Sequence, residues 1–130
     1  MSDVKYVYIC HKLGNNIEEN SKKINDICRK IALEEPNTIP FAPYMHFIQF
    51  LNDKVSEERE LGLTYNLAIM IDLKPEFRVY SEDGVITAGM KRDIVSASLT
   101  NLEIICENKA IEKDVEQLIG LAKMKLAPEY

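Results

Sequence analysis

Short runs of β-branched, aromatic and aliphatic residues alternate along this chain with longer segments whose apolar residues recur at helical spacing. The runs predict strands at residues 4–10, 38–43, 77–80 and 102–106. The longer segments predict helices at residues 17–35, 56–71, 87–99 and 108–126, with a short aromatic helix within 44–53. Strands that alternate with helices of this length form βαβ units, in which a parallel sheet carries helices on both faces. The sequence therefore predicts a small, doubly wound α/β fold of the Rossmann-like or flavodoxin-like type.

The predicted helices begin at residue types that cap helices well. These residues are Asn16, Ser56, Thr87 and Asn108. Glu19 follows Asn16 at the spacing of a capping box, and two glutamates follow Ser56 where they complement the helix dipole. Pro36 and Pro75 stop the first two long helices.

Composition limits the classes of partner. The 130 residues are 46% hydrophobic and 28% charged, which predicts one globular domain over residues 1–130. The formal charge is -5 and no basic run occurs, so a nucleic-acid polymer is not an expected partner. The longest apolar stretches are far shorter than the roughly 20 residues of a membrane span, and the amino terminus lacks a signal pattern. We therefore expect a soluble, cytoplasmic protein with no membrane partner.

The cysteines and histidines lack the spacing of metal ligands. Cys10, Cys28 and Cys106 each lie in an apolar pattern and are expected to be reduced core residues. His11 and His46 are the only histidines. The sequence therefore predicts no metal site, and it predicts no cofactor.

In a doubly wound fold, ligands bind in the loops that follow the carboxyl ends of the strands. In this chain those loops are residues 11–16, 42–46, 81–87 and 107–108. The first loop sets Gly14 and Lys12 before a helix, which suits a phosphate or carboxylate. An ordinary strand-to-helix turn is the alternative, because neither a dinucleotide fingerprint nor a P-loop is present. His11 and His46 are candidates at the rim, although His46 can equally be a partly buried ring on the helix after Pro43.

The helix predicted at residues 87–99 carries the residues best suited to ligand chemistry. Gly89 allows a ligand to approach the backbone closely, and Asp93 follows one turn later. The Asp93 carboxylate can act as a nucleophile or hold a sugar hydroxyl. The alternative is an ion pair with a lysine or arginine on the helix surface.

Several separated segments agree with one family. They are Tyr8-Ile9 before Gly14, Glu19-Asn20, Pro40-Phe41-Ala42-Pro43-Tyr44 with His46, Glu58-Arg59 with Gly62, and Gly89-Met90-x-x-Asp93-Ile94. In their order and spacing, residues 4–107 resemble the nucleoside 2-deoxyribosyltransferase-like superfamily. They are most similar to a branch of small phage and bacterial domains.

The resemblance implies a pocket for a nucleoside. Members of the superfamily cleave the N-glycosidic bond of a 2'-deoxynucleoside by attack of a glutamate carboxylate on the anomeric carbon, and then pass the sugar to another base. Tyr8 matches the family's first-strand tyrosine, and Asp93 matches the nucleophile with one methylene fewer. A displacement of about 1 Å can cost on the order of 100-fold in rate. The family's catalytic aspartate matches Pro75, and Asp72 and Glu76 are out of register.

These departures favour a non-catalytic protein that binds a small nucleoside or nucleotide. If the protein is encoded by a phage and lies in the host cytoplasm, we expect such a domain to act as an anti-defence sponge for a nucleotide immune signal, for example a cyclic ADP-ribose derivative. The predicted ligand-binding residues are Tyr8, His11, Lys12, Gly14, Asn15, Tyr44, His46, Ser81, Thr87, Gly89, Met90 and Asp93.

Two alternatives remain at this point. One is a nucleoside 2-deoxyribosyltransferase or N-glycoside hydrolase, with Asp93 as the nucleophile and Tyr8 beside it. The other is a structural subunit with an empty, vestigial pocket. The resemblance also implies a homo-oligomer, a dimer or larger, in which the neighbour's carboxyl-terminal segment helps to complete the pocket, here with Tyr130.

Overall fold

Four parallel strands form the single sheet that the computed structural model shows within its described residues, 3–126. They are β1 (Lys5–Cys10), β2 (Thr38–Phe41), β3 (Glu76–Val79) and β4 (Ile104–Cys106). Their order across the sheet is β2-β1-β3-β4, and each neighbouring pair is parallel. The chain therefore winds outward from β1 in both directions, which confirms the predicted doubly wound α/β fold.

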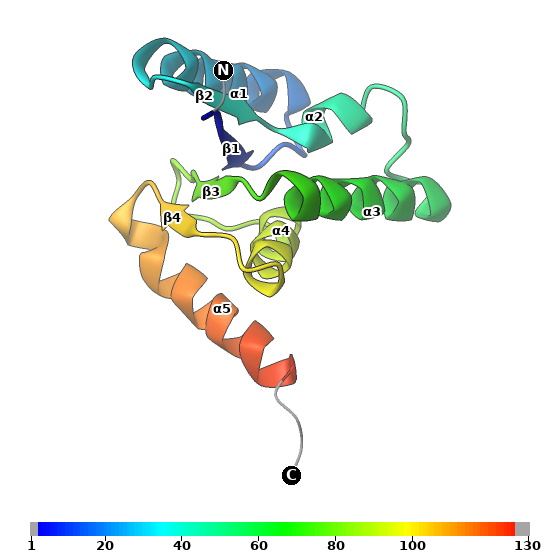
Figure 1. The fold of residues 1–130 in the computed structure, drawn as a ribbon. Coiled ribbons are helices and arrows are strands. Elements are labelled where there is room, and N and C mark those ends of the chain that lie inside the picture. Colours follow the sequence, from blue (N-terminus) through cyan, green and yellow to red (C-terminus); the bar gives the residue numbers. More distant parts are fainter. Residues whose placement is uncertain (1–2, 127–130) are drawn as a thin grey trace.

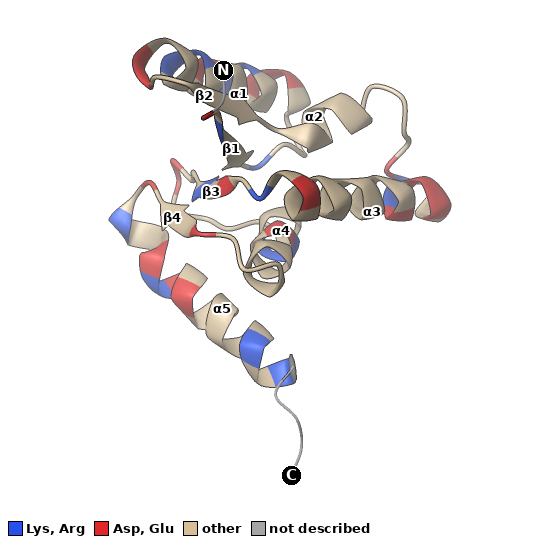
Figure 2. Ribbon diagram, viewed as in Figure 1, with Lys and Arg blue, Asp and Glu red and all other residues tan. Residues whose placement is uncertain are grey.

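Helices cover both faces of this sheet (Figure 1). They are α1 (Ile17–Glu34), α2 (Pro43–Phe47), α3 (Ser56–Leu73), α4 (Ala88–Leu99), the short 3-10 helix η1 (Lys109–Ile111) and α5 (Glu112–Leu126). None of the described helices is long and apolar enough to cross a membrane. In Figure 2 the charged residues of α3 lie toward its two ends, and its middle carries none.

The alternation of side chains along β1 divides the core into two layers. Val7 and Ile9 point to one face, where they pack with Ile24 and Ile31 of α1. Tyr8 and its neighbours on the opposite face pack against α3, α4 and α5. The fully or almost fully buried residues of this second layer include Cys10, Met70, Phe77, Val79, Met90, Ile94, Ala97, Ile111 and Val115. The tyrosine ring stacks on Phe77 of β3, with ring centroids 4.8 Å apart.

Two of the four predicted caps are confirmed. Asn16 Oδ1 accepts a hydrogen bond from the Glu19 backbone N–H at 3.1 Å, and Thr87 accepts one from the Met90 N–H. Ser56 is the first helical residue of α3, whose cap position is taken by Val55 without a side-chain hydrogen bond. Asn108 makes no cap bond either: its side-chain amide donates to the Ser81 carbonyl, and its Oδ1, the atom that would cap the helix, is buried without a hydrogen-bond partner among the described residues.

Some predicted boundaries were too wide. The strand β4 begins at Ile104 rather than at residue 102, because residues 101 and 102 close the end of α4. Asn101 adopts a left-handed conformation with φ 61°, and the Leu102 N–H bonds to the Ala97 carbonyl, as in a Schellman motif. Similarly, β2 ends at Phe41 because Pro43 begins α2, and α2 covers only five residues of the aromatic segment.

The caps generate a test of this local structure. We expect Asn16→Ala to lower the free energy of unfolding by about 1 kcal/mol, because it leaves a helix N–H without its acceptor. Ser56→Ala should change the free energy by less than about 0.5 kcal/mol, since this hydroxyl caps nothing. Urea unfolding of both variants measures the difference, and equal losses would contradict the assignment.

Candidate functional site

Two pairs of side chains, each with one basic and one acidic member, join the loops that follow β1 and β3. His11 is 4% exposed, and its Nε2 lies 2.8 Å from Glu82 Oε1. Its Nδ1 lies 2.6 Å from the Lys12 carbonyl oxygen. Because both partners only accept, both contacts are hydrogen bonds only when the ring carries a proton on each nitrogen. Beside this pair, Lys12 Nζ lies 2.8 Å from Asp83 Oδ2.

Internal hydrogen bonds hold the loop after β3 in shape. The Ser81 hydroxyl lies 2.6 Å from the Val85 carbonyl and 3.0 Å from Asp83 Oδ1. The Val85 N–H also donates to Asp83 Oδ1. Hydrogen bonds from Lys12, the Val85 backbone and Ser81 hold the pKa of Asp83 well below its usual range. Burial raises the pKa of Glu82, but the hydrogen bond and charge of His11 outweigh this and lower it overall.

A second polar cluster lies inside the core layer, on the α3 and α4 side of the sheet. The Tyr8 hydroxyl lies 3.0 Å from Asp93 Oδ2 of α4, to which it donates. From α3, the Asn66 side-chain amide donates to the Tyr8 oxygen at 3.0 Å. Tyr8 is fully buried and Asn66 is buried, whereas Asp93 is half-buried. Three elements, β1, α3 and α4, thus meet through one hydroxyl group.

Burial dominates the electrostatics of this cluster. It raises the pKa of Asp93 to about 6, and the hydrogen bond from Tyr8 and the charge of Arg92 only partly offset it. Burial also raises the pKa of Tyr8 well above its ordinary value, with a further increase from the Asp93 charge. The phenol therefore stays protonated and can donate to the carboxylate at neutral pH.

Tyr44 and Met90 lie in the same layer as this cluster. The rings of Tyr44 and Tyr8 have centroids 6.0 Å apart, and the Tyr44 hydroxyl donates to the Ile9 carbonyl. Met90 is almost fully buried among the same core residues. The structure therefore brings four of the predicted ligand-binding residues together: Tyr8, Tyr44, Met90 and Asp93.

The start of α1 is poorly suited to the anion predicted beside Gly14. Asn16 already caps this helix end, and Glu18 and Glu19 occupy its first turn, where they repel an anion. Lys12 is turned toward Asp83. The segment is an exposed strand-to-helix turn, the alternative left open by the sequence. Asn15 has φ 71° there and is exposed.

The other predicted site residues lie apart from the Tyr8 cluster. His46 is exposed on α2, where its ring meets the edge of Phe50 with centroids 5.1 Å apart, so it is not a partly buried ring. Thr87 is engaged as the cap of α4. At Gly89 an added Cβ would meet only the Arg92 guanidinium, at 3.9 Å, so the described chain itself does not require glycine there.

Sequence reasoning missed Asn66, Glu82 and Asp83 as partners of the predicted residues. A polar asparagine in the otherwise uncharged middle of α3 is a signal that could have singled out Asn66, because such side chains compete with helix formation unless they serve a contact. The two acidic residues were noticed only as part of a polar loop. Their partners lie 71 positions away in the chain, and local patterns do not reveal pairs at that distance.

Pro75 lies at the amino ends of the strands, whereas the loops joined by the two ion pairs lie at the carboxyl ends. It is fully buried and comes just before β3, and it helps to line a cavity of about 320 Å³ formed by the starts of β1, β3 and β4. Asp93 lies on the helix that follows the carboxyl end of β3. Pro75, which matches the family's catalytic aspartate, therefore lies at the amino ends of the strands. The loops that we expected to bind ligand lie at the carboxyl ends.

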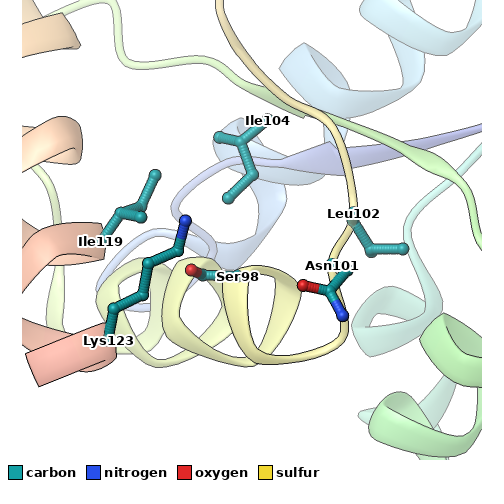
Figure 3. Close-up of a pocket in the computed structure, with 6 residues that line it drawn as sticks. All are labelled: Ser98, Asn101, Leu102, Ile104, Ile119 and Lys123. Carbon is teal, nitrogen blue, oxygen red and sulfur yellow. The ribbon is translucent and has the colours of Figure 1, made fainter. Parts of the chain in front are cut away.

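A second cavity, of about 340 Å³, lies between the end of α4, β4 and α5 (Figure 3). It is lined by Ser98, Asn101, Leu102, Ile104, Ile119 and Lys123. Figure 3 shows the Ser98 hydroxyl and the Lys123 ammonium group directed toward the space between them. None of the predicted ligand-binding residues lines either of these two cavities. Over residues 3–126, no group of three or more His, Cys, Asp and Glu side chains is arranged to hold a metal ion.

Fold and site together define an α/β domain with strand order β2-β1-β3-β4 and a tyrosine-bound carboxylate inside its core. The model of a family described as a domain of unknown function, DUF7768, matches residues 5–107. The chain belongs to this family. No curated protein and no solved structure matches the chain. The expected contribution of Tyr130 to a neighbour's site lies outside the described residues.

The raised pKa of Asp93 predicts a pH-dependent cost to stability. The unfolded chain releases this proton near pH 3.8, whereas the folded protein holds it up to about pH 6. The free energy of unfolding therefore falls as the pH rises through this interval, by up to about 3 kcal/mol. Asp93→Asn removes the titration and keeps an oxygen acceptor for the Tyr8 hydroxyl.

Urea unfolding of the wild type and Asp93→Asn between pH 4 and pH 8 measures this cost. We expect the variant to gain on the wild type as the pH rises through this interval and then to hold a constant advantage. The matched control, Asp26→Asn on the exposed side of α1, should show no such change. A difference between Asp93→Asn and wild type that is independent of pH would contradict the assignment.

Proposed function

We propose that this protein binds a small nucleoside or nucleotide without turning it over, and that Asp93 accepts a hydrogen bond from a ribose hydroxyl. The observation that carries this proposal is the half-buried Asp93 carboxylate. Its Oδ2 accepts from Tyr8, and no residue of the described chain donates a hydrogen bond to its Oδ1. A preorganised carboxylate oxygen in a low-dielectric setting is a strong acceptor for a hydroxyl group.

The charges at the carboxyl edge support binding over catalysis. A hydrolase or transferase needs an acid that donates a proton to the departing base. In the two loops after β1 and β3, Glu82 is held by His11 and Asp83 is held by Lys12 and Ser81. Interactions at both carboxyl groups lower their pKa values, so both are ionised at neutral pH and have no proton to donate.

The ion pair between Lys12 and Asp83 also indicates which class of ligand the protein binds. Lys12, the cation expected to hold a phosphate, is neutralised by Asp83, and the start of α1 carries two glutamates. These features disfavour a polyphosphate and favour recognition through the sugar and base. Nucleosides are therefore the first ligands to test. Sequestration of a cyclic ADP-ribose derivative is the form of this function that the resemblance to phage domains suggests.

One observation favours the alternative, an enzyme that acts on N-glycosidic bonds. The Tyr8 hydroxyl orients the Asp93 carboxylate, which is ionised above about pH 6. In that reaction Asp93 would attack the anomeric carbon as the carbon–nitrogen bond breaks. The base would leave with the bonding electron pair and take a proton from water, and a second base or water would then release the sugar.

A ligand-capture experiment separates these functions. Protein at stoichiometric concentration is mixed with deoxynucleosides, free bases, nucleotides and cyclic ADP-ribose isomers, then desalted and denatured, and the released molecules are identified by mass spectrometry. We expect one intact ligand from the wild type and from Asp26→Asn. Asp93→Ala should weaken binding by about 10-fold to 100-fold, the value of one hydrogen bond to a charged group.

Each other outcome has a definite meaning. Free base together with free sugar, or exchanged nucleosides, would establish the enzyme in place of the binder. A sugar found covalently attached to Asp93 would identify the nucleophile. If no compound is retained or altered by folded wild-type protein, the proposed ligand class is wrong.

A further inference from the structure

The outward side of α3 is as apolar as its inward side. From Leu61 to Ile71 this helix has no charged residue. Asn66 and Met70 are buried against the core, yet large apolar side chains also face outward. The exposed fractions are 39% for Leu61, 47% for Tyr65, 38% for Leu67 and 50% for Ile71.

These outward residues form one continuous face. At 3.6 residues per turn, they span an arc of about 160° together with the exposed Thr64 and Ala68. We call these six residues, Leu61, Thr64, Tyr65, Leu67, Ala68 and Ile71, the outer α3 face. A helix that is apolar on all sides is normally covered on all sides.

The apolar surface continues from the outer α3 face onto α2. The rings of Tyr65 and Phe47 have centroids 6.1 Å apart, and Phe50, which is 58% exposed, meets Phe47 edge to face. In Figure 1, α2 lies beside α3, and the amino-terminal half of α3 extends past α4. Contiguous apolar surface of this kind marks an interaction site.

We propose that a second copy of this chain covers the outer α3 face, with the two α3 helices antiparallel about a two-fold axis at the level of Asn66. The face is complementary to itself in this register. Leu61 then lies level with Ile71 of the second copy, and Tyr65 lies level with Leu67. The small residues Thr64 and Ala68 also lie level, which allows the helices to approach closely. A two-fold interface requires this self-complementarity.

Charge selects the antiparallel direction. The amino-terminal turn of α3 is acidic, with three glutamates and only Arg59 to offset them. At the other end, Lys74 offsets Asp72. A parallel pair would place two acidic ends together, whereas an antiparallel pair places each acidic end beside a neutral one. Antiparallel helix dipoles add to this preference. Figure 2 shows the uncharged middle of α3 between its charged ends.

The interface is tested by placing a charge on the outer α3 face, alone and then opposite a charge of the other sign. Sedimentation velocity of the full chain measures whether each sample is a monomer or a dimer. We expect a dimer for the wild type. Leu61→Lys and Ile71→Glu should each be folded monomers, because each buries two unpaired charges, and each should weaken dimerisation by at least about 100-fold. Mixing the two variants should restore a dimer, since Lys at 61 then faces Glu at 71 in the proposed register. The control Leu33→Glu, on α1 and 71% exposed, should remain dimeric.

The remaining outcomes overturn the proposal at defined points. A monomeric wild type, or a dimer that survives in both variants, would overturn the outer α3 face as the interface. Two monomeric variants that do not associate on mixing would overturn the antiparallel register. Circular dichroism of each variant shows that it is folded, and the test requires no ligand, so it is independent of the proposed binding function.

Discussion

The hydroxyl group of Tyr8 connects the central strand to two helices inside the core. A tyrosine at the centre of a buried strand must find hydrogen-bond partners, because an unpaired buried hydroxyl costs about 1–3 kcal/mol. Asn66 of α3 and Asp93 of α4 meet that requirement, so both helices are positioned relative to β1 by one atom. The same arrangement partly buries the Asp93 carboxylate, and this burial raises its pKa to about 6. The polar cluster is thus a structural tie and, in the proposed function, also the group that contacts the ligand.

The carboxyl edge of the sheet is held together in a different way. There His11 with Glu82, and Lys12 with Asp83, connect the loops that follow β1 and β3, the two strands between which the winding direction reverses. The edge is where this fold class binds ligands, yet here its charged groups satisfy one another. A ligand at this edge therefore meets a fixed, largely neutralised surface. The free acceptor lies deeper, on Asp93, which is why the proposed recognition begins with a sugar hydroxyl.

Local patterns predicted the strands and helices because their causes are local. Alternating and helical periodicity located every main element, and Asn16 capped α1 as its spacing with Glu19 indicated. Asn108 shows the limit of such reasoning. It has the right residue type and position for a cap, but its amide donates to the Ser81 carbonyl on a neighbouring loop, and its Oδ1 accepts no helix N–H. The candidate site also combines local and long-range causes. Asp93 was predicted from its local motif, whereas the role of Asn66 depends on its contact with Tyr8, which is distant in the sequence.

The two faces of α3 show how the interior and the exterior of this protein are linked. Asn66 must face inward to reach Tyr8, and this fixes the rotation of the helix about its axis. Once that rotation is fixed, Leu61 and Ile71 face outward, about 140° around the helix from Asn66, and Tyr65 and Leu67 lie exposed on its two flanks, about 100° from Asn66. Turning α3 to hide those residues would leave the Tyr8 hydroxyl without its amide donor. The exposed apolar surface is therefore a geometric consequence of the buried polar cluster, and in the proposed dimer a second copy of the chain covers it.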